Sequence, residues 1–162
     1  MRFAIKALGD YTRVLPKTLA VGDPVRVEGP YGRFDFDHSA PHQIWVAGGI
    51  GLTPFIARME ALAAASGTPS RVDLFYSTRE ISPTTLARVR GIAANSHVAL
   101  HVTDTRQDPS LDAAAIVAAV PDWREASIWF CGPASFGDAL EAAFCAAGLA
   151  PGRLRREAFE FR

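Results

Sequence analysis

A run of glycines between an expected strand and an expected helix is the first feature that could do chemistry. It reads Ala47-Gly48-Gly49-Ile50-Gly51-Leu52-Thr53-Pro54. Glycines let a backbone approach a phosphate closely, and the first N–H groups of a helix have no partner within it. Gly49 and Gly51 can adopt left-handed angles, and Thr53 adds a hydroxyl donor. The turn predicts a diphosphate site, with an ordinary tight turn as the alternative.

The end of the second expected strand carries another candidate group. It reads Tyr76-Ser77-Thr78-Arg79-Glu80, at a place where dinucleotide-binding folds usually put a carboxylate for the ribose. The hydroxyl of Ser77 and the guanidinium of Arg79 suit a 2′-phosphate instead, because arginine can bind it with two parallel hydrogen bonds. Ser77 and Arg79 therefore favour NADPH as the coenzyme. The preference is modest because the acidic Glu80 is adjacent, and NADH stays possible. An exposed polar loop is the alternative interpretation.

A third candidate turn, Cys131-Gly132-Pro133, follows the fourth expected strand. We expect that strand to lie beside the first one, where the order of the sheet reverses, so that both turns face one crevice. Taken alone, Cys131 is typical of a small buried hydrophobic residue. Cys145 is expected in a helix, facing the core, with a structural role.

Strands alternating with helical patterns from His42 onward would position these turns. The expected strands are 43–47, 72–76, 98–102, 128–130 and 154–161. The first expected helix has Thr53 as its N-cap and Pro54 in its first turn. The other three start at Ser82-Pro83, at Asp108-Pro109 or Ser110, and after Pro133. This alternation predicts an α/β fold, a five-stranded parallel sheet of order 3-2-1-4-5 with helices on both faces.

The residues before 42 have a different character. Residues 3–8 and 25–28 are expected to form strands, residues 12–19 a helical turn, and Gly and Pro mark the connections. Two such strands are typical of the edge of a β-barrel or sheet. The chain therefore divides into a short β-type segment, 1–41, and an α/β domain, 42–162.

Composition excludes several classes of function. The 162 residues carry 17 basic and 17 acidic side chains, and this balance argues against nucleic acid as a partner. Neither a membrane-length apolar run nor a secretory leader is found, so a cytoplasmic location is expected. The two cysteines make neither a zinc pattern nor a disulfide framework. No metal site is predicted, because the four histidines are scattered: His38, His42, His97 and His101.

Five motifs together resemble the ferredoxin–NADP reductase superfamily, in particular bacterial ferric-reductase and NADPH-oxidase-like proteins. They lie, in chain order, at residues 27–34, 46–54, 76–79, 131–133 and 157–159. The resemblance covers essentially the whole chain in the order and spacing of the family. It implies NADPH as one cofactor and FAD as another, with hydride passing from NADPH to FAD and electrons passing onward to haem or iron.

The resemblance also implies roles for individual residues. The glycine turn, 48–54, would hold the nucleotide diphosphate, while Ser77 and Arg79 would contact its adenosine end. Gly132 and Pro133 would bind the nucleotide as well. Three residues would lie at the nicotinamide and flavin rings and take part in hydride transfer; these are Cys131, Glu157 and Phe159. Thr12 would contact the FAD diphosphate.

The chain also departs from the family pattern. The flavin domain of the family is a β-barrel of about a hundred residues, and only its last strands correspond to residues 1–41. The resemblance therefore implies an antiparallel FAD-barrel remnant followed by a complete NAD(P)H-binding domain. The parent protein would supply the rest of the barrel and a haem-bearing membrane portion, placing this chain at the cytoplasmic face. The alternative is a non-catalytic nucleotide-binding or electron-transfer module that needs a separate flavin- or haem-bearing partner.

Overall fold

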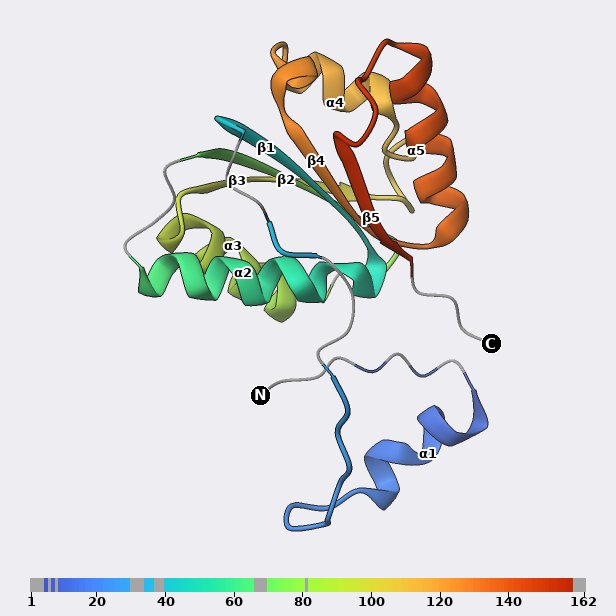
Figure 1. Cartoon of the computed structure of the whole chain (residues 1–162). Helices are drawn as coiled ribbons and strands as arrows, with labels where there is room; N and C mark the ends of the chain where they lie inside the picture. The colour runs from blue at the N-terminus through green and yellow to red at the C-terminus, as the bar shows by residue number, and fades with distance from the viewer. Residues whose placement is uncertain are drawn as a thin grey trace. The chain divides into compact units, whose positions relative to one another are not determined.

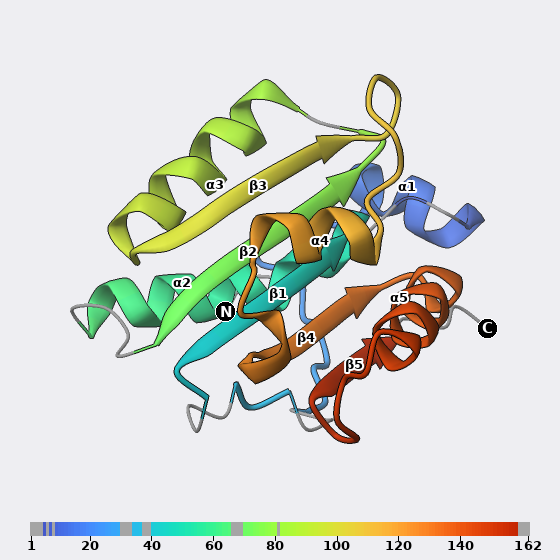
Figure 2. The same cartoon turned by 90° about the horizontal axis from the view of Figure 1, so that it is seen from above.

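Five parallel strands form one sheet in the spatial order β3-β2-β1-β4-β5, and Figure 2 shows them side by side. In this computed structural model they are β1 His42–Gly48, β2 Arg71–Thr78, β3 Val98–Asp104, β4 Ser127–Gly132 and β5 Leu154–Ala158. The predicted fold class and strand order are confirmed. The order reverses between β1 and β4, so the turns that follow these two strands are neighbours.

The structure describes residues 5, 7, 9–29, 34–36, 40–65, 70–80 and 82–158. Contacts divide the chain into two units, Met1–Arg33 and Phe34–Arg162, and the sheet lies in the second. Several predicted features fall outside the described residues, including most of the strand at 3–8, the motif residues 30–33 and Phe159. Within the described part, no helix has the length and apolarity needed to span a membrane.

Two helices cover each face of the sheet (Figure 1). Helices α2 Thr53–Ala64 and α3 Pro83–Asn95 lie on one face, and α4 Ala113–Ala119 and α5 Ala134–Ala146 lie on the other. Two short 3-10 helices, η1 Gly49–Leu52 and η2 Trp123–Glu125, precede α2 and β4. This layering is what parallel strands joined by helical crossovers require.

Two predicted helix starts are wrong, for local reasons. Thr53 is the first residue of α2 and not its N-cap, because η1 already has a helical backbone up to Leu52. Helix α4 starts after Asp112, whose side chain accepts a hydrogen bond from the amide of Ala115 at 2.8 Å. Asp108, an expected start, instead accepts a hydrogen bond from the amide of Asp104. The start of α3 at Ser82-Pro83 is confirmed.

Alternate residues of β1 fill two separate cores. Trp45 and Ala47 pack on the side of α2 and α3, and Ile44 and Val46 pack on the side of α4 and α5. All seven residues of β1 are buried, as expected for a central parallel strand. The prediction that Cys145 faces the core is wrong: it is exposed, because it lies about 100° around α5 from the buried Phe144.

Among its described residues, the first unit contains one helix, α1 Asp10–Thr18, where the sequence predicted a helical turn. The predicted strand at 25–28 is not formed, and Val25 and Val27 are 66% and 50% exposed. A strand needs a hydrogen-bonded neighbour, and the described residues of this unit offer none. Phe34 and Phe36, which the sequence assigned to the barrel segment, pack against the core beside Trp129.

A buried carboxylate on β2, Asp73, forms hydrogen bonds to side chains of β1 and β3. Asp73 accepts hydrogen bonds from Nε2 of His42 at 2.8 Å and from Nε2 of His101 at 2.7 Å. The guanidinium of Arg71 lies 3.2 Å away, and Nδ1 of His42 lies 3.2 Å from the carboxylate of Asp122. Burial raises the pKa of Asp73. Hydrogen bonds from His101 and His42 and the charge of Arg71 together lower it by more than burial raises it, so the net shift is downward.

We expect Asp73→Asn to lower the free energy of unfolding by about 3 kcal/mol, because it removes the charged partner of a buried histidine. Asp138 of α5 forms an exposed ion pair with Arg156 of β5 and is a matched control. Asp138→Asn should cost less than about 1 kcal/mol. Urea unfolding at pH 7 measures both changes.

The same carboxylate predicts a pH dependence. Because its folded pKa is lowered, its contribution is present above the unfolded pKa and is lost as pH falls through the folded pKa. Wild type and Asp73→Asn should therefore converge in stability in acid. A difference between them that stayed constant down to pH 2 would contradict this assignment.

Candidate functional site

The turn after β1 and the turn after β4 touch through their backbones. A Cβ added at Gly51 would lie 2.0 Å from the carbonyl oxygen of Cys131 and 2.9 Å from the amide nitrogen of Gly132. Real Cβ atoms essentially never come within 3.0 Å of such an atom. Only glycine fits at position 51 without moving one of the two turns.

Two further glycines bring the same turns together. A Cβ at Gly48 would lie 2.7 Å from Cδ of Pro133, and one at Gly132 would lie 3.0 Å from the Cα of Gly48. The structure thus unites two groups of predicted site residues, one from each turn. They are Gly48, Gly49 and Gly51 with Thr53 and Pro54, and Cys131 with Gly132 and Pro133.

Gly49 marks the open side of this junction. Its φ is +55°, a left-handed value, and a Cβ there would meet nothing within 4 Å. Helix α2 begins four residues later, with Pro54 in its first turn, and the first amides of a helix attract anions. The hydroxyl of Thr53 donates to the carbonyl of Ile50 at 2.8 Å, so it can offer a ligand only acceptor lone pairs.

Cys131 and Glu157 are register partners on β4 and β5. The thiol is fully buried in the core below α2 and α3. Burial, and next the negative charge of Glu157, raise the pKa of Cys131 to about 12. The thiol therefore stays protonated near neutral pH, and its nucleophilic form is suppressed. This agrees with the interpretation of Cys131 as a small buried hydrophobic residue.

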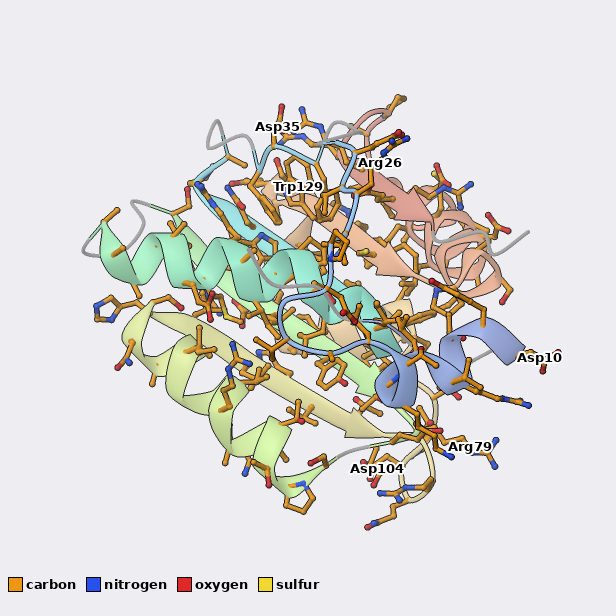
Figure 3. All side chains as sticks on the ribbon, turned by 90° about the horizontal axis from the view of Figure 1, so that it is seen from below. Asp10, Arg26, Asp35, Arg79, Asp104 and Trp129 are labelled. Carbon is orange, nitrogen blue, oxygen red and sulfur yellow. The ribbon has the colours of Figure 1, made fainter. Side chains whose placement is uncertain are left out.

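The residues predicted at the end of β2 lie next to the glycine turn. Ser77, 9% exposed, pairs in register with Gly48 of β1 and Thr103 of β3. Arg79 and Glu80 follow the strand and are exposed. In Figure 3, Arg79 lies at the same end of the sheet as Asp104, the last residue of β3. A cavity opens between this end of β2 and the first turn of α3.

Sequence reasoning missed a second arginine at this edge. The guanidinium of Arg106 makes two hydrogen bonds to the carboxylate of Asp104, at 3.0 Å and 2.6 Å. The amide of Thr105 donates to the carbonyl of Thr78 at 3.0 Å, which attaches this loop to the end of β2. The sequence signal for this pair was the spacing of Asp104 and Arg106, two residues apart just beyond the third expected strand.

Two predicted site residues lie outside the described part of the second unit. Thr12 lies in the first unit, where its hydroxyl accepts from the amide of Gly9 and donates to the carbonyl of Gly9. Phe159 lies outside the described residues. The search for a cluster of metal ligands found none among the residues that the structure describes.

The sequence and the fold have counterparts among known proteins. No protein-family model matches the chain. Over 139 residues it is 37% identical to the phenoxybenzoate dioxygenase subunit beta of Ectopseudomonas oleovorans, a match covering 86% of this chain and 41% of the relative. The chain thus spans about two fifths of that relative's length.

Two solved structures extend the comparison. An intact type IV self-sufficient cytochrome P450 monooxygenase superposes with a TM-score of 0.73 and 28% identity, covering 98% of this chain and 20% of the other. The ferredoxin–NADP+ reductase from Plasmodium falciparum gives a TM-score of 0.68 over 93% of this chain and 65% of its own, and its 15% identity shows the fold alone.

The relatives and structural neighbours of the chain are oxidoreductases of the ferredoxin–NADP reductase family, as the resemblance in the sequence implied. The five-stranded sheet with helices on both faces is the NAD-binding domain fold of this superfamily. The junction of the turns after β1 and β4 lies where open α/β sheets bind their ligands, at the carboxyl ends of the strands beside the reversal of strand order.

We expect Gly51→Ala to lower the free energy of unfolding by about 2 kcal/mol or more, because its methyl group would overlap the backbone of β4. Gly91, exposed in α3 with no atom within 4 Å of an added Cβ, is the matched control. Gly91→Ala should raise stability by about 0.5–1 kcal/mol. Equal effects of the two substitutions, measured by urea unfolding, would show that the two turns do not touch.

The two cysteines should differ in reactivity. At pH 8 a disulfide reagent should modify the exposed Cys145 rapidly and the buried Cys131 only after unfolding, because a buried, protonated thiol is a poor nucleophile. Absorbance of the released thiolate counts the groups, and Cys145→Ser should remove the fast phase. Rapid modification of Cys131 in the folded Cys145→Ser protein would contradict its placement in the core.

Proposed function

We propose that this chain is the NAD(P)H-binding domain of a flavin-dependent oxidoreductase. In the complete system, hydride would pass from NADPH to FAD, and electrons would pass onward to an oxygenase or a haem-bearing protein. The observation that carries the proposal is the contact between the Gly51 turn and the Cys131–Gly132 backbone. It joins the two turns beside an open glycine and the start of a helix, and we place the diphosphate of a dinucleotide in a crevice at this junction.

The residues of the crevice fit a pyridine dinucleotide. Gly49 leaves room at the start of η1, and the first amides of α2 would face the diphosphate. Gly132 and Pro133 form the opposite wall, and Ser77 lies beside Gly48 toward the adenosine end. When bound, the nucleotide supplies a hydride from its nicotinamide ring.

Cys131 and Glu157 are the proposed residues at the reacting end. The neutral thiol of Cys131 would support the floor of the site from within the core, and no proton transfer is assigned to it because burial raises its pKa to about 12. Glu157 is partly exposed beside it, and its carboxylate would orient the ring through hydrogen bonds. Phe159, two residues farther along, is proposed to pack against the same ring.

The flavin site is proposed to lie mainly on further protein. The contact of Thr12 with the FAD diphosphate stays a prediction of the sequence; in the first unit its hydroxyl is hydrogen-bonded to the backbone of Gly9. The strongly exposed large hydrophobic side chains found among the described residues, from Ile5 to Val27, all lie in the first unit. This supports the proposal that residues 1–41 belong with a flavin-binding barrel, although no strand forms at 25–28.

The acceptor is proposed from the systems in which the relatives work. One matched protein is named as a dioxygenase subunit and the other is a cytochrome P450 monooxygenase, which supports an oxygenase or haem acceptor. Two further points stay predictions of the sequence: that ferric iron is the acceptor, and that the parent protein has a membrane portion that carries haem.

The direct test is to purify the chain, record its visible spectrum, and titrate it with NADPH and NADH in a calorimeter. A colourless protein that binds nucleotide supports a separate NAD(P)H domain. A yellow protein that oxidises NADPH would show that the flavin site is also present. Failure to bind either nucleotide, with a normal unfolding transition, would overturn the proposal.

Arg79→Ala should weaken the binding of NADPH by about 1–3 kcal/mol, because it removes charge-assisted hydrogen bonds to the 2′-phosphate. The affinity for NADH should stay close to that of wild type. Arg90→Ala, an exposed arginine in the second half of α3, is the matched control for lost positive charge. A similar loss for NADPH and NADH would mean that Arg79 does not bind the 2′-phosphate.

A further inference from the structure

Two phenylalanine rings lie against the junction of the turns after β1 and β4. Phe130 of β4 and Phe136 of α5 meet edge to face, with ring centroids 5.3 Å apart and an interplanar angle of 84°. Phe130 is fully buried in the core on the side of α4 and α5, and Phe136 packs against that core. An edge-to-face pair is a favourable aromatic geometry, so each ring helps to hold the other in place.

Three glycines leave the space that these rings fill. A Cβ added at Gly137 of α5 would lie 2.7 Å from Cε1 of Phe130, and one at Gly132 would lie 3.1 Å from Cζ of the same ring. A Cβ at Gly48 would lie 3.3 Å from Cδ1 of Phe136. The Phe130 ring is therefore wedged between α5 and the backbone at the end of β4, and neither side can accept a methyl group without a shift.

The start of α5 is also tied to the turn after β4 by hydrogen bonds. The carbonyl of Pro133 accepts from the amides of Phe136 and Gly137, both at 3.1 Å. Glycine is a poor helix former, and Gly137 lies within α5 without a positive φ. Its close approach to the Phe130 ring is the physical reason for a glycine at this position.

The Phe130 ring has little freedom to yield to a larger side chain on α5. It is 0% exposed, and protein interiors are packed closely enough to transmit such a strain. A methyl group at position 137 would push the ring toward Gly132, where a Cβ would lie only 3.0 Å from the backbone of Gly48. The displacement would thus reach the junction of the two turns, where we place the diphosphate of the coenzyme.

We propose that Phe130 is a positioning residue for the nucleotide site: its ring, wedged against Gly137 of α5, holds the turn after β4 in place beside the turn after β1. The affinity for the diphosphate and nicotinamide portion of the coenzyme then depends on the packing between α5 and β4. This inference rests on the proposed nucleotide-binding function of the same junction.

The test is Gly137→Ala, with calorimetric titrations of NADPH, NADH and adenosine 2′-monophosphate. We expect the affinity for both coenzymes to fall about ten-fold, because the overpacked ring displaces the turn after β4. Adenosine 2′-monophosphate carries only the end of NADPH that lies toward β2, and its affinity should stay within about two-fold of wild type. Unchanged coenzyme affinity, or an equal loss for the fragment, would overturn the inference.

Phe130→Leu provides a rescue experiment, because leucine lacks the ring atoms Cε1 and Cζ. By itself it should weaken both coenzymes about three-fold and spare the fragment, since the turn loses its support. Adding Gly137→Ala to it should cost less than about a further two-fold, because the collision no longer exists. A full ten-fold loss in the double variant would show that the ring does not transmit the effect. Phe130→Leu alone tests the inference if Gly137→Ala does not fold.

Leu140 offers a matched control for lost stability, because it is 2% exposed in the same core and lies on α5 beyond Gly137. Leu140→Ala should lower the midpoint of urea unfolding and leave the affinity for both coenzymes within about two-fold of wild type. A loss as large as that of Gly137→Ala would attribute the effect to general destabilisation and overturn the inference, with the proposed function intact. If wild type binds neither coenzyme, the proposed function fails and this inference fails with it.

Discussion

The contact between Gly51 and the end of β4 is the constraint on which the rest of the site depends. At this point two backbones approach so closely that even a methyl group would overlap a carbonyl oxygen, 2.0 Å away. The contact sets the width of the crevice and the path of η1 into α2. It also places Gly49, with its left-handed φ of +55°, on the open side, where a ligand can reach the first amides of the helix.

The two edges of the sheet use their polar residues in different ways. At the amino end, Asp73 is buried and bonded to two histidines from neighbouring strands. Because its hydrogen bonds are satisfied internally, this cluster contributes to stability. At the carboxyl end, Arg79 and Glu80 are exposed beside a cavity. The same kinds of side chain are available there for a ligand, as is usual for open α/β sheets.

The site is assembled from segments far apart in the chain, and parallel pairing explains how. Strand β1 pairs with both β2 and β4, so that Gly48 lies beside Ser77 on one side and near Gly132 on the other. Each crossover returns the chain to the same edge of the sheet, and every turn after a strand is delivered there. The dinucleotide that we propose would then span the edge, with its diphosphate at β1, its adenosine toward β2 and its nicotinamide toward β4.

Local sequence alone determined the alternation of strands and helices and the glycine turns, since these follow from periodicity, from proline and from glycine within a few residues. Only the tertiary structure decided which groups meet. The distance between Gly51 and Cys131, the Asp73 cluster and the pairing of Arg106 with Asp104 are set by packing across strands or within a folded loop. The sequence did not predict three features correctly: the start of α4, the exposure of Cys145 and the absence of a strand at 25–28. Each depends on a neighbour that periodicity along the chain does not specify.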